Sequence, residues 1–332
     1  MNIINVSDFT PEWSWLEEEL KPLNLNSIHF SSQSIKSPSR LPKRGSFNRA
    51  AAALKAVREA KKSPSVLVSH TPRPTYYCAS FAKMLSPDTP HLAYSFNFTD
   101  LPTGSQRKSM AKAFKQPTRF VTFSTDERQL YADYFDMPIE LIDMQHWSVN
   151  PPKIDLESPP VETGDYICAL GSQARDYKTL LLAMKKLKHI KLVVVATEEN
   201  MKGLDVPENV TVYSNIPYAK AFNILTHSQF MVLPLRDSVV PCGHGSIVSA
   251  MFHQKAIIIT DSSGVYDYIK NEETGLFYEA QNVEDLSQKI AYMWEDKSRL
   301  NKLCEASYQF AHTYCSEKTA RNYLSNFVDS LK

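Results

Sequence analysis

The stretch YICALGSQARDYKTLLLAM (166–184) joins a short apolar run to a glycine and then to apolar residues at helical spacing. This succession is typical of the strand, turn and helix that begin a parallel βαβ unit. Similar apolar runs, rich in β-branched and aromatic residues, recur along the chain and alternate with helical patterns. They predict twelve strands, at 3–6, 26–30, 65–70, 91–98, 119–124, 139–144, 166–170, 191–197, 210–214, 230–235, 256–260 and 276–279. We therefore expect an α/β protein with two doubly wound parallel sheets.

A proline-rich segment, NPPKIDLESPPVETGD (150–165), separates the two series of strands. Its four prolines and polar residues favour an extended linker. A chain of 332 residues is long enough for two hydrophobic cores. We predict one Rossmann-like domain over 1–150, a linker over 151–165 and a second Rossmann-like domain over 166–311. Residues 312–332 are expected to form a C-terminal helix that packs back on the first domain, and the two domains are expected to face a cleft.

The composition argues against several classes of protein. There are 37 Lys and Arg against 36 Asp and Glu, a balance that does not suit a nucleic-acid-binding protein. Five cysteines without a C-x-x-C pair argue against a disulfide framework or a zinc ribbon and suit a reducing compartment. The first residues carry no secretory signal pattern, and no apolar run has membrane-spanning length. A cytoplasmic protein is expected.

Residues 36–119 are strongly basic, with 16 Lys and Arg but only Glu59, Asp88 and Asp100 as acids. The densest part, residues 34–62, is a basic loop followed by an Ala-rich helical pattern. A solvated helix face would account for this charge. Attraction to a negatively charged acceptor or to an anionic membrane surface is the functional alternative, at about 1 kcal/mol per well-placed basic residue. The second reading predicts a peripheral position at the inner face of a membrane.

Ligands of open α/β sheets bind beyond the carboxyl ends of the strands, so the residues after each strand are candidate site residues. In GSQARDYK (171–178), a glycine turn leads into a helix. Backbone N–H groups and the Arg175 guanidinium would bind a phosphate there, unless Arg175 pairs with Asp176 at the surface. In PCGHGSIVSAM (241–251), two glycines flank His244 and precede another helix. This turn suits a pyrophosphate close to the backbone, or simply a tight strand-to-helix connection.

The order of these segments resembles that of the GT-B-type glycosyltransferases, particularly the large retaining nucleotide-sugar-dependent group of bacterial glycan-assembly enzymes. GSQARDYKTLLLAM resembles the phosphate-binding segment of that group, and LPLRDSVVPCGHGSIVSAMFHQKAIIITDSSGVYDYI resembles its donor loop, helix, strand and glycine turn. NEETGLFYEAQNVEDLSQKIAYMW resembles the strand and helix that close the donor domain. FVTFSTDERQLYADYFDMPIELIDMQHWSVN resembles the end of the first domain. The resemblance extends from about Arg119 to Met293.

The resemblance implies that the second domain binds a nucleotide sugar, UDP- or GDP-linked, as co-substrate without a further cofactor. The implied donor-binding residues are Gly171, Ser172, Arg175, Lys178, Gly243, His244, Gly245, Ser246 and Ser249. The two glutamates of the family's E-x7-E pattern correspond to Pro241 and Ser249, so both are missing. Asp-x-Asp and clustered metal ligands are also absent from the sequence. We therefore expect metal-independent transfer, with the leaving-group charge stabilised by Arg175, Lys178, His244 and helix N-termini.

The first domain is then expected to bind a glycan or lipid-linked acceptor. A general base must reach the acceptor hydroxyl, and His70 and Asp100 follow strands of this domain. Packing of His70, or helix capping by Asp100, is the structural alternative. Asn97 stands where the family often has a histidine and completes the candidate catalytic set. Arg73 is expected to bind an anionic portion of a substrate and Asp8 to lie near the acceptor.

Several functions agree with these patterns. The leading one is a glycosyltransferase of cell-surface polysaccharide or glycolipid synthesis. The resemblance favours retention of the anomeric configuration, and inversion by Asp100 or His70 stays open. A non-catalytic GT-B-like protein that binds glycan or supports a partner is the second, and a nucleotide-sugar 2-epimerase the third. A Rossmann dehydrogenase is disfavoured because the first predicted strand is followed by no G-x-G-x-x-G.

Overall fold

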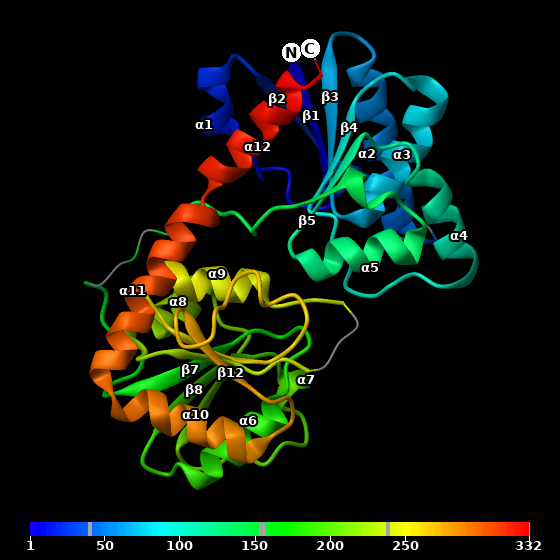
Figure 1. The fold of residues 1–332 in the computed structure, drawn as a ribbon. Coiled ribbons are helices and arrows are strands. Elements are labelled where there is room, and N and C mark those ends of the chain that lie inside the picture. Colours follow the sequence, from blue (N-terminus) through cyan, green and yellow to red (C-terminus); the bar gives the residue numbers. More distant parts are fainter. Residues whose placement is uncertain (39–41, 153, 155–156, 237–239, 332) are drawn as a thin grey trace. The chain divides into compact units, whose positions relative to one another are not determined.

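The chain folds into two compact units. In the computed structural model, residues 1–331 are described except 39–41, 153, 155–156 and 237–239. Unit 1 comprises Met1–Gln145 together with Glu317–Lys332, and unit 2 comprises His146–Ser316. Each unit contains one six-stranded parallel sheet with helices packed on it (Figure 1). The prediction of two Rossmann-like α/β domains is confirmed.

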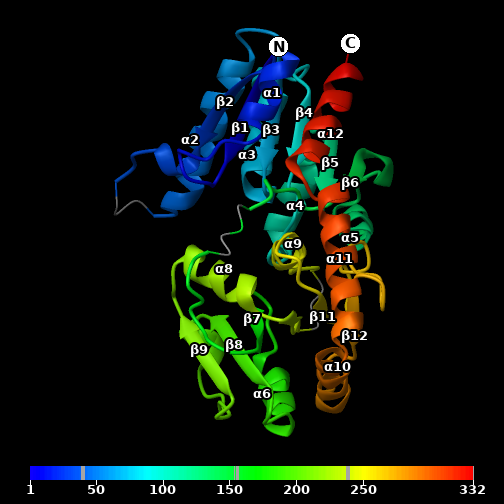
Figure 2. The ribbon, with the colours of Figure 1, turned by 90° about the vertical axis from the view of Figure 1, so that its left-hand side faces the viewer.

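The sheet of unit 1 has the strand order β2-β1-β3-β4-β5-β6. Its strands are β1 (Asn2–Ser7), β2 (Asn26–Ser31), β3 (Ser65–His70), β4 (His91–Tyr94), β5 (Arg119–Thr122) and β6 (Ile142–Met144). Its helices are α1 (Glu17–Leu20), α2 (Arg44–Ala60), α3 (Pro72–Leu85), α4 (Gly104–Ala113), α5 (Thr125–Phe135) and α12 (Glu317–Asp329), with short 3-10 turns at Lys21–Leu23, Ser32–Ser34 and Ile139–Leu141. Within this unit, α2 and α3 cover one face of the sheet and α1 and α12 the other, as Figure 1 shows with the sheet edge-on and Figure 2 from the side of α1 and α12.

The sheet of unit 2 has the order β12-β11-β10-β7-β8-β9. Its strands are β7 (Tyr166–Leu170), β8 (Lys191–Ala196), β9 (Val210–Ser214), β10 (Met231–Leu233), β11 (Ile257–Thr260) and β12 (Gly275–Tyr278). Its helices are α6 (Tyr177–Lys186), α7 (Glu198–Met201), α8 (Tyr218–His227), α9 (His244–Phe252), α10 (Val283–Glu295) and α11 (Lys297–Tyr314). Apolar clusters fill both faces of this sheet, as the continuous apolar runs of its strands require.

All twelve predicted strands are present, with small shifts at their ends. Strand β4 stops at Tyr94 instead of residue 98, because Ser95 takes a left-handed conformation with φ of 53°. The predicted strand at 139–144 begins with a 3-10 turn, so that β6 is shorter. Part of the predicted linker, at 153 and 155–156, lies outside the described residues.

The C-terminal residues are divided between the two units. Helix α11 belongs to unit 2, and α12 belongs to unit 1. There, Arg321 Nη1 lies 3.0 Å from Glu19 Oε2, and the Tyr323 hydroxyl donates to Asp143 Oδ2 at 2.7 Å. Both ends of the chain therefore contribute to the first unit. No helix in the described part of the chain combines the length and the hydrophobicity needed to cross a lipid bilayer.

Each sheet has one point where the chain reverses the direction in which strands are added. In unit 1 this switch point lies between β1 and β3, and in unit 2 it lies between β7 and β10. The helices that follow the two strands of a switch point lie on opposite faces, which leaves a crevice beyond the carboxyl ends of those strands. These two crevices are where a ligand is expected.

Candidate functional site

A cavity of about 720 Å³ lies at the switch point of unit 2. It is formed by the carboxyl end of β7, the ends of β8 and β9, and the first turns of α8 and α9. Among the residues predicted to bind a nucleotide-sugar donor, those that line it are Gly171, Ser172, Gly245, Ser246 and Ser249. The structure therefore brings together two segments of sequence that are more than 70 positions apart.

Arg175 connects these two segments from behind the cavity wall. Its Nη1 donates to the carbonyl of Gln173 at 2.6 Å and its Nη2 to Ser246 Oγ at 2.8 Å. The side chain packs against Gly171, where an added Cβ would lie only 2.5 Å from Nη2. Gly171 also has a φ of 122°, so both its backbone and its neighbour require a glycine.

The charge of Arg175 is buried without an acidic partner. The residue is 7% exposed, and it forms no ion pair with any of the described residues. Asp176 does not pair with it, because that carboxylate caps α6 by accepting from Thr179 N at 3.1 Å and Thr179 Oγ1 at 2.6 Å. Burial lowers the pKa of the guanidinium. A buried cation is costly unless an anion compensates it, so the site favours a negatively charged ligand.

The N-terminus of α9 supplies the second positive element of this cavity. Gly243 is its N-cap, with a φ of 94° and without a side-chain cap. Two residues of the first turn, Gly245 and Ser246, line the cavity, and backbone N–H groups at a helix N-terminus favour an anion. By contrast, the N-terminus of α6 has a side-chain cap, because Asp176 accepts from Thr179 N. Phosphate binding at the turn after Gly171 stays a prediction.

Besides Arg175, three predicted donor-binding residues do not line the cavity. Lys178 is exposed on α6, and a Cβ added to Gly243 would lie 3.4 Å from the side chains of Leu233 and Leu235. His244 is 3% exposed, bonds through Nε2 to the carbonyl of Gly264 at 2.9 Å and stacks on Tyr268. A histidine so enclosed shapes the turn before α9. Neither Lys178 nor His244 lines the cavity, so the structure does not bring these two predicted residues to it.

Sequence reasoning missed the aromatic part of this cavity. Tyr218 and Phe222 lie one turn apart on α8, with ring centroids 6.2 Å apart, and both line the cavity together with Trp147. Tyr218 is 83% exposed. The aromatic pair at i and i+4 after the end of β9 was the available signal. Asn200, also missed, donates to the carbonyl of Ser172 at 2.9 Å and holds the turn after β7.

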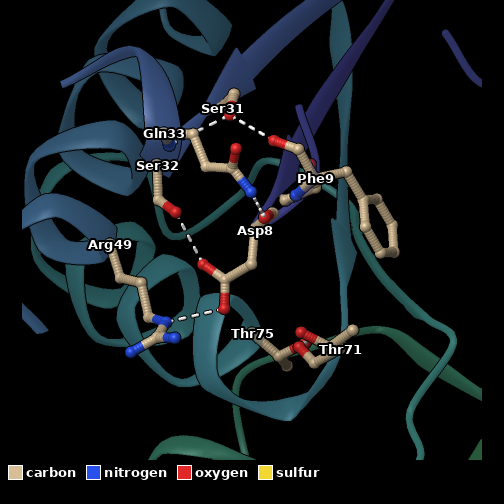
Figure 3. Close-up of polar contacts among 9 residues, drawn as sticks. Asp8, Phe9, Ser31, Ser32, Gln33, Arg49, Thr71 and Thr75 are labelled. Carbon is tan, nitrogen blue, oxygen red and sulfur yellow. Dashed lines mark hydrogen bonds and ion pairs between the residues drawn. The ribbon is translucent and has the colours of Figure 1, made fainter. Parts of the chain in front are cut away.

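Unit 1 has a cavity of about 480 Å³ at its own switch point. Four predicted residues line it: Asp8 after β1, Arg73 after β3, and Asn97 and Asp100 after β4. Asp100 and Arg73 are exposed. Asp8 is held in place, because its carboxylate accepts from Arg49 Nε at 2.6 Å and from Ser32 Oγ at 2.7 Å (Figure 3).

His70 is not part of this cavity. It is 1% exposed, accepts or donates one hydrogen bond with Asn5 Oδ1 at 3.0 Å, and is enclosed by the rings of Trp13 and Trp15. Burial, with a smaller contribution from His29, lowers the pKa of the His70 ring to about 3. A base must reach the acceptor hydroxyl, so the expectation of a catalytic role for His70 is corrected to packing.

Asn97 is oriented by a buried carboxylate. Its Nδ2 donates to Glu127 Oε1 at 2.9 Å, and Glu127 also accepts from the Tyr131 hydroxyl at 3.1 Å and from Phe123 N at 2.9 Å. Glu127 is fully buried on α5. With Nδ2 engaged in this way, Oδ1 is the atom of the Asn97 amide left to accept a hydrogen bond in the cavity. Asp100 is then the remaining predicted base at this cavity.

Within the described residues, no three His, Cys, Asp or Glu side chains gather closely enough to hold a metal ion. The five cysteines are free thiols. Burial raises the pKa of Cys168 to about 12, so this thiol is not a nucleophile at neutral pH. Transfer without a metal stays a prediction.

The fold and its two switch-point cavities define the GT-B architecture, and comparison with known proteins agrees. Residues 158–310 match the family "Glycosyl transferases group 1". The matched residues lie within unit 2, and the recognition of a GT-B-type glycosyltransferase from the sequence motifs is confirmed.

One curated relative and several solved structures support this assignment. The relative is N,N'-diacetylbacillosaminyl-diphospho-undecaprenol alpha-1,3-N-acetylgalactosaminyltransferase of Campylobacter jejuni, 34% identical over 110 residues, which are 33% of this chain and 28% of that protein. Sucrose-phosphate synthase of Thermosynechococcus elongatus has a TM-score of 0.77 at 12% identity and covers 100% of this chain and 99% of its own. Anabaena HepE in complex with UDP has a TM-score of 0.71 at 11% identity and covers 99% and 100%.

Proposed function

We propose that this protein transfers a sugar from a nucleotide-sugar donor, bound in unit 2, to a glycan or lipid-linked acceptor, bound in unit 1. The observation that carries the proposal is the buried Arg175 guanidinium behind a cavity at the unit 2 switch point. A structural protein has no use for a buried, uncompensated cation beside an uncapped helix N-terminus. A nucleoside diphosphate supplies the negative charge that this site lacks.

UDP is the nucleotide we favour, because HepE, which shares the fold, has been crystallised with UDP and with UDP-glucose. The name of the Campylobacter jejuni relative states a lipid-linked acceptor, which supports an acceptor of that kind here. Arg175 and the N-terminus of α9 would stabilise the charge that develops on the leaving diphosphate. We propose retention of configuration and transfer without a metal, in polysaccharide or glycolipid synthesis.

Isothermal titration with UDP, GDP and the other nucleoside diphosphates tests the donor site. We expect one of them to bind to the unmodified chain and Arg175→Ala to weaken that binding by at least 30-fold, since charge-assisted hydrogen bonds contribute about 1.5–3 kcal/mol each. Lys178→Ala is the matched control, because Lys178 is a nearby exposed cation of the same segment. Equal affinities for Arg175→Ala and the unmodified chain would contradict the assignment of the diphosphate to this cavity.

A non-catalytic, nucleotide-binding GT-B-like protein is the second candidate. One observation favours it: Pro241 and Ser249 replace the two family glutamates, and the Ser249 hydroxyl donates to the Gly245 carbonyl at 2.7 Å. A single hydroxyl cannot hold two ribose hydroxyls as a carboxylate does. Turnover decides between the two candidates. Release of nucleoside diphosphate from a nucleotide sugar that is abolished by Asp100→Asn supports transfer, whereas tight binding without release supports the second candidate.

A further inference from the structure

Unit 1 contains a second cavity, of about 410 Å³, between α2, α3 and α4. It shares a wall with the switch-point cavity, because Arg49, Arg73, Gln106 and Met110 line both. The rest of its lining consists of hydroxyl-bearing side chains: Ser46, Tyr76, Tyr77, Ser105 and Ser109. The two cavities adjoin, and the two arginines belong to their shared lining.

The two cavities differ in charge. The switch-point cavity has two carboxylates in its lining, Asp8 and Asp100. The second cavity contains both arginines and no Asp or Glu among its lining residues. Carboxylates suit the hydroxyl groups of a sugar, whereas a cavity whose only charges are guanidinium groups suits an anion. Both arginines also line the switch-point cavity, but two carboxylates accompany them there, so the second cavity is the one that favours negative charge.

Both arginines have guanidinium N–H groups that bond none of the described residues. Arg49 is anchored to Asp8 through Nε alone, so that its two terminal amino groups have no acceptor among the described residues (Figure 3). Asp8 is itself fixed by Ser32 Oγ, and its backbone carbonyl accepts from Gln33 Nε2 at 2.7 Å. Arg73 is exposed and forms no hydrogen bond or ion pair with the described residues. Arg49 is thus held in place and Arg73 can adjust its position, and both guanidinium groups border the second cavity.

Helix α4 adds to the positive potential of the second cavity. Its first turn contains Ser105 and Gln106, both lining residues, and it has neither an acidic side chain nor a side-chain cap from Thr103. The N–H groups of this ten-residue helix that lack an intrahelical partner therefore face the same region. This contribution reinforces the arginines and would be insufficient without them.

We propose that the second cavity binds the phosphate or diphosphate group of the acceptor between Arg49 and Arg73, while the sugar of the acceptor occupies the switch-point cavity. The ligand's role as acceptor rests on the proposed function; the anion site itself rests only on the arginines and the cavity. Two guanidinium groups can hold a phosphate through paired hydrogen bonds that lysine side chains do not reproduce. Asp8 is a positioning residue here, because it orients Arg49.

Isothermal titration with inorganic pyrophosphate tests the site. The titration is made in the Arg175→Ala background, so that pyrophosphate does not report on the unit 2 cavity. We expect Arg73→Ala and Arg49→Ala each to weaken binding by at least tenfold. Arg58→Ala is the matched control: Arg58 is an exposed cation of the same helix as Arg49, lines neither cavity, and should change the affinity less than twofold.

Three results would overturn the proposal: no binding of pyrophosphate, an equal loss in all three variants, or full binding in Arg73→Ala. Arg73 is exposed, so its removal should not impair folding, and Arg73→Lys adds a test of geometry because it keeps the charge. We expect Arg73→Lys to recover less than half of the lost binding free energy. If Arg73→Lys bound pyrophosphate as tightly as the chain with Arg73, the attraction would depend on charge alone. That result would contradict a site of defined geometry.

The phosphate could belong to a lipid-linked diphosphate or to a soluble sugar phosphate. Co-sedimentation with phosphatidylcholine vesicles that contain polyprenyl diphosphate tests the first source, and titration with a hexose 6-phosphate tests the second. If binding depends on Arg73 in either experiment, the result supports the site and identifies its ligand. If binding depends on Arg73 in neither experiment, the site is contradicted. UDP binding, measured in parallel, reports on the proposed donor site of unit 2. If that proposal failed, the pyrophosphate binding that depends on Arg73 would still be observed, so the two proposals can fail independently.

Discussion

Each unit has a cavity at the same point of a similar sheet, and the charged side chains around the two cavities differ in burial. In unit 2 the cation, Arg175, is 7% exposed and tied to both sides of the cavity. In unit 1 the cation Arg73 is exposed, and the buried charge is an anion, Glu127. A buried charge is preorganised but needs a partner of fixed geometry. The cation of unit 2 is thus fixed in place, whereas Arg73 of unit 1 can adapt its position.

The largest effect expected from this contrast is on the stability of unit 1. Glu127 is fully buried and accepts from Asn97, Tyr131 and Phe123, so Glu127→Ala leaves three donors without an acceptor. We expect a loss of about 3–5 kcal/mol in the free energy of unfolding of unit 1. Urea unfolding followed by hydrogen exchange, with peptides of each unit resolved, measures it.

Glu127→Gln is the control for that experiment, because it keeps one acceptor oxygen and should cost less than Glu127→Ala. Peptides of unit 2 should not change in either variant. A loss for Glu127→Ala within about 0.5 kcal/mol of zero, the usual range for surface substitutions, would show that the carboxylate does not organise the unit 1 cavity.

Gly171→Ala should have the next largest effect, and it should act on unit 2. A Cβ at this position would lie 2.5 Å from Arg175 Nη2, so the guanidinium must move. We expect the affinity for UDP to fall about 30- to 100-fold, since each 1.4 kcal/mol is a factor of ten. Isothermal titration measures this loss.

Gly203→Ala provides the comparison for Gly171→Ala. Gly203 also has a positive φ, 73°, but nothing lies within 4 Å of an added Cβ. Its substitution therefore adds backbone strain of about 1 kcal/mol without displacing a side chain. If both alanine variants weakened UDP binding equally, displacement of Arg175 could not be the cause.

A smaller effect is expected from acid. Burial lowers the pKa of both His70 and His91 in unit 1 to about 3. Below pH 6.5 the unfolded chain takes up protons at these residues and the folded chain does not, so stability falls as the pH falls from 6.5 towards 3. Two such histidines should cost about 2 kcal/mol between pH 6.5 and 5.5.

Urea midpoints at these two pH values measure the loss, and His91→Gln should remove about half of it, because Gln can keep the hydrogen bond that His91 Nε2 shares with Ser69 Oγ at 2.7 Å. An unchanged pH dependence in His91→Gln would contradict a role for this ring in acid sensitivity.

The strands could be predicted from the sequence because a buried parallel strand needs only a local run of apolar residues. Site residues could be predicted only where their position at the end of a strand is enough to place them in the site. Lys178 follows the same strand as Arg175, but Asp176 starts α6 at Tyr177 and thereby turns Lys178 to the surface. His70 ends a strand at the switch point, yet Trp13 and Trp15, distant in sequence, enclose it. These outcomes depend on helix phase and tertiary packing, which no local pattern encodes.

The smallest effect is expected at the exposed edge of the unit 2 cavity. Tyr218 is 83% exposed, so Tyr218→Ala should leave the free energy of unfolding unchanged within about 0.5 kcal/mol. Its ring nonetheless lines the cavity beside Phe222, where the base of a nucleotide can stack on it. Stacking on an aromatic side chain contributes about 1–3 kcal/mol per base, and we expect the lower end, a loss of about fivefold in UDP affinity.

Tyr218→Phe tests whether the ring of Tyr218 or its hydroxyl contributes to the affinity for UDP. If stacking is the cause, Phe restores the affinity for UDP, whereas a loss equal to that of Ala would assign the contact to the hydroxyl. Affinity for inorganic pyrophosphate at the same cavity should be unaffected by either change, because the base is absent from that ligand. A parallel loss of pyrophosphate binding would mean that Tyr218 acts on the diphosphate region, and the division of unit 2 into a buried, charged part and an exposed, aromatic part would fail.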